Sequence, residues 1–271
     1  MNKAAKTILF AIVYIYLGMA ALLYFQQRSL MYFPGGEREN IATFKITQPE
    51  IISVQSTPDI SFNAWYWPAD IGMPTLVFFH GNGQAYQYWV NKLMIYHNQG
   101  YGVFFTDYRG YGGAKGNPGE QGIYTDARAH INSLLKSTNL TTNDLIYHGE
   151  SLGTGVATQM AIEFPPKAII YESAYSATND IGKSRYWMFP IDLLMKDKYR
   201  SADKIKTLTM PKLFVHGTKD KVIPIRFGRA LYDAAPEPKK WIEIENAGHN
   251  DLYDNGAQLH ISKFLSTLIN Q

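Results

Sequence analysis

The chain reads LIYHGESLGTGVATQMAIE over residues 145–163, and this stretch decides the predicted fold. An apolar run at 145–148 predicts a buried strand, and the run at 152–163 predicts a helix. The sharp turn between them has the pattern Gly149-x-Ser151-x-Gly153. After a strand and before a helix, this pattern is typical of a nucleophilic serine, because the strained turn exposes the hydroxyl beside the helix N-terminus. Taken alone, the stretch also fits a glycine–serine turn that only caps a helix.

Short apolar segments on both sides of this stretch predict the rest of a sheet. Eight strands are expected, at 52–56, 61–67, 75–80, 102–107, 145–148, 168–172, 212–216 and 240–244. Helical patterns are expected at 86–99, 121–136, 152–163, 227–235 and 256–269. This order predicts an α/β fold with a mostly parallel eight-stranded sheet and helices on both faces. Residues 29–271 then form one domain, with a cap-like insertion around 173–211.

A serine hydroxyl needs a base to become a strong nucleophile. His249 follows the last predicted strand, in a loop that leaves the same sheet edge as Ser151. Asp220 follows the strand before it and is the expected acid, which would hold the His249 tautomer and stabilise the imidazolium. Glu172 and Asp107 end other strands and are the reserve acids. Asp220 could instead be a turn former.

Attack on a carbonyl also needs donors for the oxyanion. The backbone N–H of Leu152, directly after Ser151, is expected to be one donor. The second is expected from the loop at 80–84, which reads HGNGQ, and the backbone N–H of Asn82 is the choice. A glycine-rich turn without this role is the alternative.

The N-terminal run at 7–25 contains no charged residue and reads TILFAIVYIYLGMAALLYF. As a helix it is ~28 Å long, close to the ~30 Å of a bilayer's hydrocarbon core. It predicts a single membrane anchor at 1–28 with no evident packing partner; a cleaved signal peptide and a buried helix are the alternatives. Lys3 and Lys6 precede the run and only Arg28 closely follows it, so the catalytic domain is expected on the non-cytoplasmic side.

Composition excludes several classes of protein. The 271 residues include no cysteine, which excludes disulfides, thiol catalysis and cysteine-bound zinc. The net charge is only +3 and the basic residues are dispersed, so no nucleic-acid partner is expected. The expected partners are a small-molecule or acylated substrate and the membrane, and the chemistry needs no metal or cofactor.

The motifs FFHGNG (78–83), DYRGYG (107–112), GESLGT (149–154), HGTKD (216–220) and AGHN (247–250) resemble the α/β-hydrolase superfamily. They are similar, more narrowly, to its membrane-anchored branch, which includes eukaryotic protein depalmitoylases and bacterial inner-membrane homologues. The resemblance implies a Ser151–Asp220–His249 triad, with Asn82 and Leu152 at the oxyanion hole and Arg109 tying down loops. The depalmitoylases carry a cysteine-rich N-terminal segment, which this chain lacks.

These observations predict a membrane-anchored serine hydrolase that cleaves a carboxylic ester or thioester through an acyl-enzyme. A peptidase or amidase acting on small peptides is the second choice. A catalytically idle, membrane-anchored interaction module is the alternative from another class.

Overall fold

The structure is a computed structural model that describes residues 2–83 and 85–269. Gln84, at the end of the predicted oxyanion loop, lies outside the described residues. The described strands are β1 (Glu50–Thr57), β2 (Ile60–Trp67), β3 (Thr75–Phe79), β4 (Gly102–Phe105), β5 (Leu145–Glu150), β6 (Ala168–Glu172), β7 (Lys212–Gly217) and β8 (Lys239–Ile244). They correspond one to one to the eight predicted strands and differ from them only at their ends.

All eight strands form one sheet, in the order β1-β2-β4-β3-β5-β6-β7-β8. The β1–β2 and β2–β4 pairs are antiparallel, and every other pair is parallel. The predicted mostly parallel sheet is therefore confirmed. Because β5, β7 and β8 run in the same direction, the loops after them leave one edge of the sheet, where functional residues collect in such folds.

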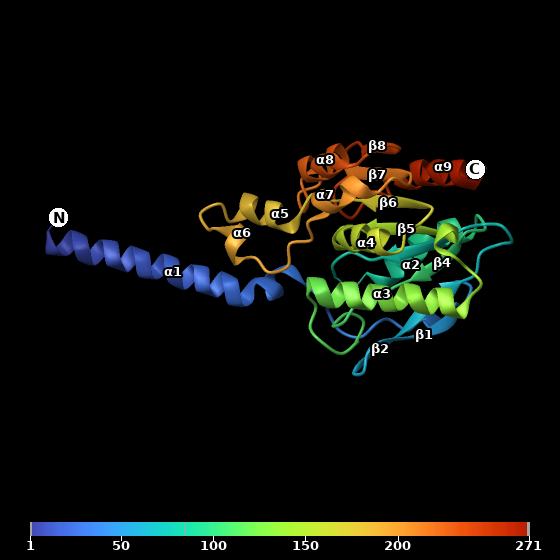
Figure 1. The fold of residues 1–271 in the computed structure, drawn as a ribbon, viewed down its shortest axis with the longest axis horizontal. Coiled ribbons are helices and arrows are strands. Elements are labelled where there is room, and N and C mark those ends of the chain that lie inside the picture. The colour runs from blue at the N-terminus through green and yellow to red at the C-terminus, as the bar shows by residue number, and fades with distance from the viewer. Residues whose placement is uncertain (1, 84, 270–271) are drawn as a thin grey trace.

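Helices cover both faces of this sheet, as predicted (Figure 1). The α-helices are α1 (Lys3–Met31), α2 (Tyr86–His97), α3 (Glu120–Ser137), α4 (Leu152–Glu163), α5 (Thr178–Arg185), α6 (Ile191–Leu194), α7 (Ser201–Lys204), α8 (Ile225–Ala234) and α9 (Ala257–Ile269), and the short 3-10 helices are η1 (Ile41–Thr43), η2 (Thr142–Asp144) and η3 (Ile205–Thr207).

Alternating side chains of β3 show how the two halves of the core form. Val77 packs into a cluster that includes Val156 of α4, while its neighbour Leu76 packs into a second cluster that includes Leu93 of α2 and Leu265 of α9. Successive side chains of a strand point to opposite faces, so a fully apolar strand needs a helix layer on each side. This burial fixes the sheet rigidly beneath the loops at its carboxyl edge.

Helix α1 projects away from the sheet, and its C-terminal half lies beside α6 (Figure 1). Among the described residues it is the one helix that is long and apolar enough to cross a bilayer, a test that signal sequences near an N-terminus also pass. None of its residues is buried. The expectation that this run has no packing partner is wrong, however, because Tyr16 within the run stacks on Phe189 of the connection between β6 and β7. Gln27 and Arg28, just after the run, bind the same connection.

The connection between β6 and β7, residues 173–211, holds α5, α6, α7 and η3. Its described residues include no strand, as the sequence predicted. It leaves the sheet next to β5 and therefore lies close to Ser151. We call it the 173–211 connection below.

Candidate active site

Ser151 occupies the strained turn between β5 and α4. Its backbone has φ 50° and ψ −117°, in a region that a non-glycine residue rarely adopts. The flanking glycines are required sterically: a Cβ on Gly153 would lie 1.9 Å from the Phe79 carbonyl oxygen, and one on Gly149 would lie 2.7 Å from the Gly153 oxygen. The backbone N–H of Ser151 donates to the Glu172 carbonyl at 2.9 Å, which holds the turn on β6. The turn thus presents the serine side chain at the N-terminus of α4.

The structure brings together the three residues that the sequence selected. His249 Nε2 lies 3.0 Å from Ser151 Oγ, and His249 Nδ1 lies 2.7 Å from Asp220 Oδ2. Both separations are hydrogen-bond distances. The Asp220 side chain is fully buried and that of His249 is nearly so. The geometry is that of a nucleophile, a base and an acid that orients the base.

Asp220 is held as a carboxylate by its surroundings. Burial alone would raise its pKa, but hydrogen bonds from His216 and His249 lower the pKa well below its ordinary value. The backbone N–H groups of Val222 and Ile223 also donate to Oδ1, each at 2.8 Å. These two donors turn the chain directly after Asp220. The sequence analysis offered Asp220 either as the acid or as a turn former, and the structure combines both: Asp220 forms the turn and also binds His249.

The oxyanion donors were predicted at the backbone N–H groups of Asn82 and Leu152. Among the described residues, neither N–H donates to a protein acceptor. The Asn82 side chain fixes its loop: Oδ1 accepts the Phe33 N–H at 2.8 Å and the Tyr111 hydroxyl at 2.7 Å, while Nδ2 donates to the Met31 carbonyl at 2.7 Å. The side chain therefore binds this loop to the segment that follows α1, a role that the sequence analysis missed.

The two reserve acids are bound elsewhere. Glu172 accepts hydrogen bonds from Lys92 at 2.6 Å, His148 at 2.7 Å and Tyr253 at 2.9 Å. Lys92 also binds Glu150, the residue before Ser151. Burial alone would lower the pKa of Lys92, but the attraction of Glu150 and Glu172 raises it. Burial alone would raise the pKa of Glu172, but the attraction of Lys92 lowers it. This buried charge cluster lies directly behind the serine turn, and no local pattern in the sequence marks it.

Asp107, the other reserve acid, binds Tyr86 and the Tyr108 N–H instead. Burial would raise its pKa, but a hydrogen bond from His80 lowers it. Arg109 in the same motif binds Asp126 of α3 through two side-chain contacts, at 2.9 and 2.7 Å. As the resemblance implied, Arg109 ties a loop near the site to a helix.

An apolar pocket of about 240 Å³ opens above Ser151. One wall comes from the C-terminal half of α1, with Leu23 and Leu30, and the opposite wall comes from the 173–211 connection, with Tyr186 and Leu194. The sequence analysis assigned the first wall only to membrane anchoring. The polar residues directly after the apolar run were the signal that this end of α1 meets the protein. Among residues 2–83 and 85–269, no three His, Asp or Glu side chains are arranged to hold a metal ion.

A strained serine between a central strand and a helix, on a mostly parallel sheet with helices on both faces, defines the α/β-hydrolase class of fold. The comparisons agree with this class. A family profile described as alpha/beta hydrolase fold matches residues 74–181. An uncharacterized protein of Mycobacterium tuberculosis is 31% identical over 254 residues, which cover 92% of this chain and 90% of that protein. The chain belongs to the α/β-hydrolase superfamily.

Two further relatives are informative. Human alpha/beta hydrolase domain-containing protein 17B is 29% identical over 201 residues, which cover 71% of this chain and 66% of the human protein. Among solved structures, an esterase of Pyrococcus furiosus superposes with a TM-score of 0.70 at 15% identity, over 88% of this chain and 98% of the esterase. At this identity the superposition supports the shared fold only.

Proposed function

We propose that this protein is a membrane-anchored serine hydrolase that cleaves a carboxylic ester or thioester through an acyl-enzyme. Ser151 Oγ attacks the carbonyl carbon while His249 Nε2 takes its proton. The N–H groups of Asn82 and Leu152 stabilise the oxyanion, and His249 then protonates the leaving group. Water, activated by the same imidazole, releases the acid. Asp220 stays ionised throughout and stabilises the imidazolium.

One observation carries the proposal: the continuous hydrogen-bonded chain from Ser151 through His249 to Asp220, with separations of 3.0 and 2.7 Å. Membership of the α/β-hydrolase superfamily supports a hydrolase in general. An apolar pocket above the serine favours an acyl substrate over a charged one.

The membrane part of the proposal rests on α1. Residues 1–28 serve as the anchor, residues 29–271 form the catalytic domain, and the 173–211 connection acts as a cap over the pocket. The length and apolar composition of α1 support the anchor. The two lysines ahead of the helix favour a cytoplasmic N-terminus, which places the catalytic domain on the other side of the membrane.

Labelling with a fluorophosphonate tests the chemistry, because this probe reacts with an activated serine. The full chain in detergent micelles is expected to be labelled, and Ser151→Ala is expected to abolish the label. Ser173→Ala is the matched control: Ser173 also follows a strand and has a positive φ of 47°, but its side chain is buried outside the hydrogen-bonded trio. Absence of labelling in correctly folded parent protein would refute the enzyme and favour an interaction module.

Esters, thioesters and amides with one common acyl group then separate the substrate classes. We expect the ester and thioester to be cleaved faster than the amide. Preferential cleavage of the amide would contradict the esterase proposal and favour the peptidase.

A further inference from the structure

The 173–211 connection is bound along α1 for much of the helix. Tyr16 stacks on Phe189 with ring centroids 5.1 Å apart, and its hydroxyl donates to the Met188 carbonyl at 2.9 Å. At the other end, Arg28 donates to Asp197 at 2.9 Å. Tyr16 and Arg28 are separated by ~18 Å along a helix with a rise of 1.5 Å per residue. The connection therefore extends well up the helix that would cross the membrane.

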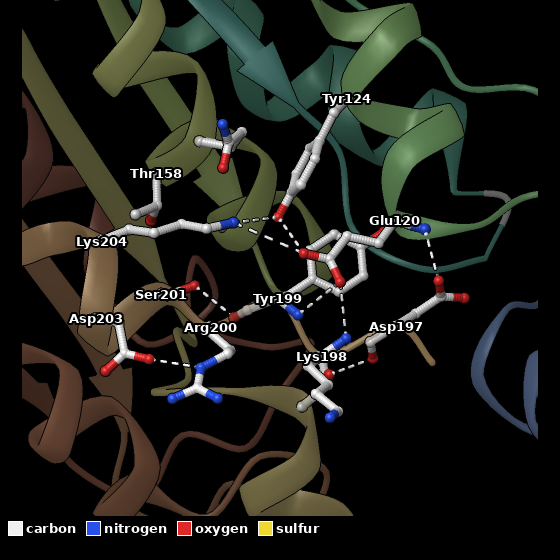
Figure 2. Close-up of polar contacts among 12 residues, drawn as sticks. Glu120, Tyr124, Thr158, Asp197, Lys198, Tyr199, Arg200, Ser201, Asp203 and Lys204 are labelled. Atoms are coloured by element: carbon white, nitrogen blue, oxygen red, sulfur yellow. Dashed lines mark hydrogen bonds and ion pairs between the residues drawn. The ribbon is translucent and has the colours of Figure 1, made fainter. Parts of the chain in front are cut away.

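A network of backbone and side-chain bonds fixes the lower end of this contact. Asp197 Oδ1 accepts the Glu120 N–H of α3 at 3.1 Å, and Glu120 Oε2 accepts the N–H groups of Lys198 and Tyr199 at 2.8 and 3.1 Å (Figure 2). Since Arg28 binds the same Asp197, α1 is attached to the catalytic domain through a carboxylate that is itself fixed. The position of α1 relative to the sheet is thereby defined.

The length of the free part of α1 has a consequence for membrane depth. Among the described residues, no hydrogen bond or ring contact joins residues 3–15 to the rest of the domain. The uncharged run among them, 7–15, spans ~14 Å, whereas a bilayer's hydrocarbon core is ~30 Å thick. A spanning α1 therefore also places in the membrane ~16 Å of the helix from Tyr16 toward its C-terminal end, where α1 contacts the 173–211 connection.

The part of the connection beside α1 exposes three large apolar side chains. Trp187 is 79% exposed, Met188 58% and Leu193 80%. We call these three residues the cap tip. Tryptophan favours the membrane interface, and exposed apolar clusters of this kind mark interaction surfaces. Asp192 and Lys183 on the same connection are bound to each other at 3.0 Å, so these two charges neutralise each other in the headgroup region.

The apolar pocket connects this surface to the proposed nucleophile. It lies between α1 and the connection, with Leu23 at its outer end and Ser151 at its base. From Leu23 to Met31 the α1 wall measures ~12 Å, which is enough to cover an extended acyl chain of medium length. A pocket with the membrane helix as one wall can receive an acyl chain directly from the bilayer.

We infer that the cap tip inserts into the leaflet next to α1, and that Ser151 receives medium-chain acyl esters from the bilayer through the pocket between α1 and the 173–211 connection. The substrate part of this inference rests on the proposed hydrolase function. The insertion part rests only on the contacts and exposed residues above.

A fluorescent label tests insertion independently of activity. Because the chain has no cysteine, Met188→Cys and Ile71→Cys each provide one labelling site. Ile71 is also a fully exposed apolar residue but lies in a turn after β2. With an environment-sensitive dye, and the full chain in phosphatidylcholine vesicles that contain a lipid-bound quencher, we expect quenching at position 188 and none at 71. Equal water exposure at both positions would overturn the inference.

Matched esters test the substrate class. The rate on 4-methylumbelliferyl decanoate in phosphatidylcholine vesicles is divided by the rate on the water-soluble acetate. We expect the W187D/L193D variant to lower this ratio at least ~10-fold, since the burial of one large apolar side chain alone accounts for a factor of this size. The I71D/L259D variant, with two exposed apolar residues elsewhere, should leave the ratio unchanged.

Both variants keep α1 and therefore remain bound to the membrane. A lower ratio of the two ester rates then shows that the opening of the pocket has moved away from the bilayer. An unchanged ratio in W187D/L193D would overturn the substrate part. If the folded parent chain cleaved neither ester, the proposed function would fail and the substrate part with it, while the label at position 188 would still decide insertion.

Discussion

Replacing Lys92 with methionine should strongly destabilise the protein. Lys92 is fully buried and binds two carboxylates, Glu150 and Glu172. The variant keeps the volume of the side chain but leaves two negative charges close together without their common partner. Breaking a buried ion pair from one side typically costs ~3–5 kcal/mol. For a chain of this size the expected loss in Tm is ~6–20 °C, at ~2–4 °C per kcal/mol.

The pH dependence identifies the cause. In the parent, the pKa of Glu172 is held below its ordinary value, so the stability it contributes is present above the unfolded pKa and is lost as the pH falls through the folded pKa. In Lys92→Met, one carboxyl must take up a proton to fold. The destabilisation should therefore be smaller at about pH 5 than at about pH 8. Glu172→Gln in the Lys92→Met background should recover part of the loss.

Thermal unfolding of the full chain in detergent micelles provides the measurement. Lys183→Met is the matched control, because Lys183 also lies between two carboxylates, Asp180 at 3.3 Å and Asp192 at 3.0 Å, but on the surface. Exposed pairs contribute little, so we expect almost no change in Tm for this variant. A Lys92→Met shift no larger than that of Lys183→Met, or one independent of pH, would refute the reasoning.

Three further predictions concern individual side chains. Asp220→Asn removes the charge that stabilises the His249 imidazolium, and ester turnover should fall by ~10³–10⁴ in kcat; a fall below ~10-fold would contradict the proposed role of the acid. Asn82→Ala keeps its backbone N–H but loses three side-chain hydrogen bonds that fix the loop, so kcat should fall by up to ~10². Tyr111→Phe loses only one of these bonds, and its kcat should fall less. Equal losses of kcat in the two variants would show that the Asn82 side chain does not position the loop. Burial lowers the pKa of Lys212 to about 8, while in the unfolded chain it is ~10.4. Between these values the unfolded state binds more protons, so the parent should gain stability relative to Lys212→Met as the pH rises; a constant difference in Tm would disagree.

Local patterns were sufficient to predict the fold. The strands of this sheet are short, apolar and separated by amphipathic helices, and each of these signals lies within a few residues. The site residues are also marked locally. Gly149 and Gly153 occur because a Cβ at either position would collide with backbone, and Asp220 and His249 each follow a strand that ends at the Ser151 edge. Chain order and strand ends were therefore enough to select residues that the structure brings together.

The remaining features depend on contacts that no local pattern encodes. Lys92 lies within an ordinary helical pattern, and its partners are 58 and 80 positions away. In a sequence, such a lysine cannot be distinguished from one on a solvated helix face. The contact between Tyr16 and Met188 joins residues 172 positions apart. An apolar run predicts that its side chains are shielded from water, but it does not specify whether lipid or another segment of the protein covers each face of the helix.

The position of Asn82 links the two halves of the proposed mechanism. Its side chain binds the Met31 carbonyl and the Phe33 N–H, directly at the end of α1, while its backbone N–H is a proposed oxyanion donor. Three residues before Met31, Arg28 holds the 173–211 connection through Asp197. The last turn of α1 therefore contacts both the loop that would stabilise the transition state and the connection that would bind the acyl chain. An anchor attached in this way does more than concentrate the enzyme at a membrane, because a change in the tilt of α1 would move the oxyanion loop and one wall of the pocket together.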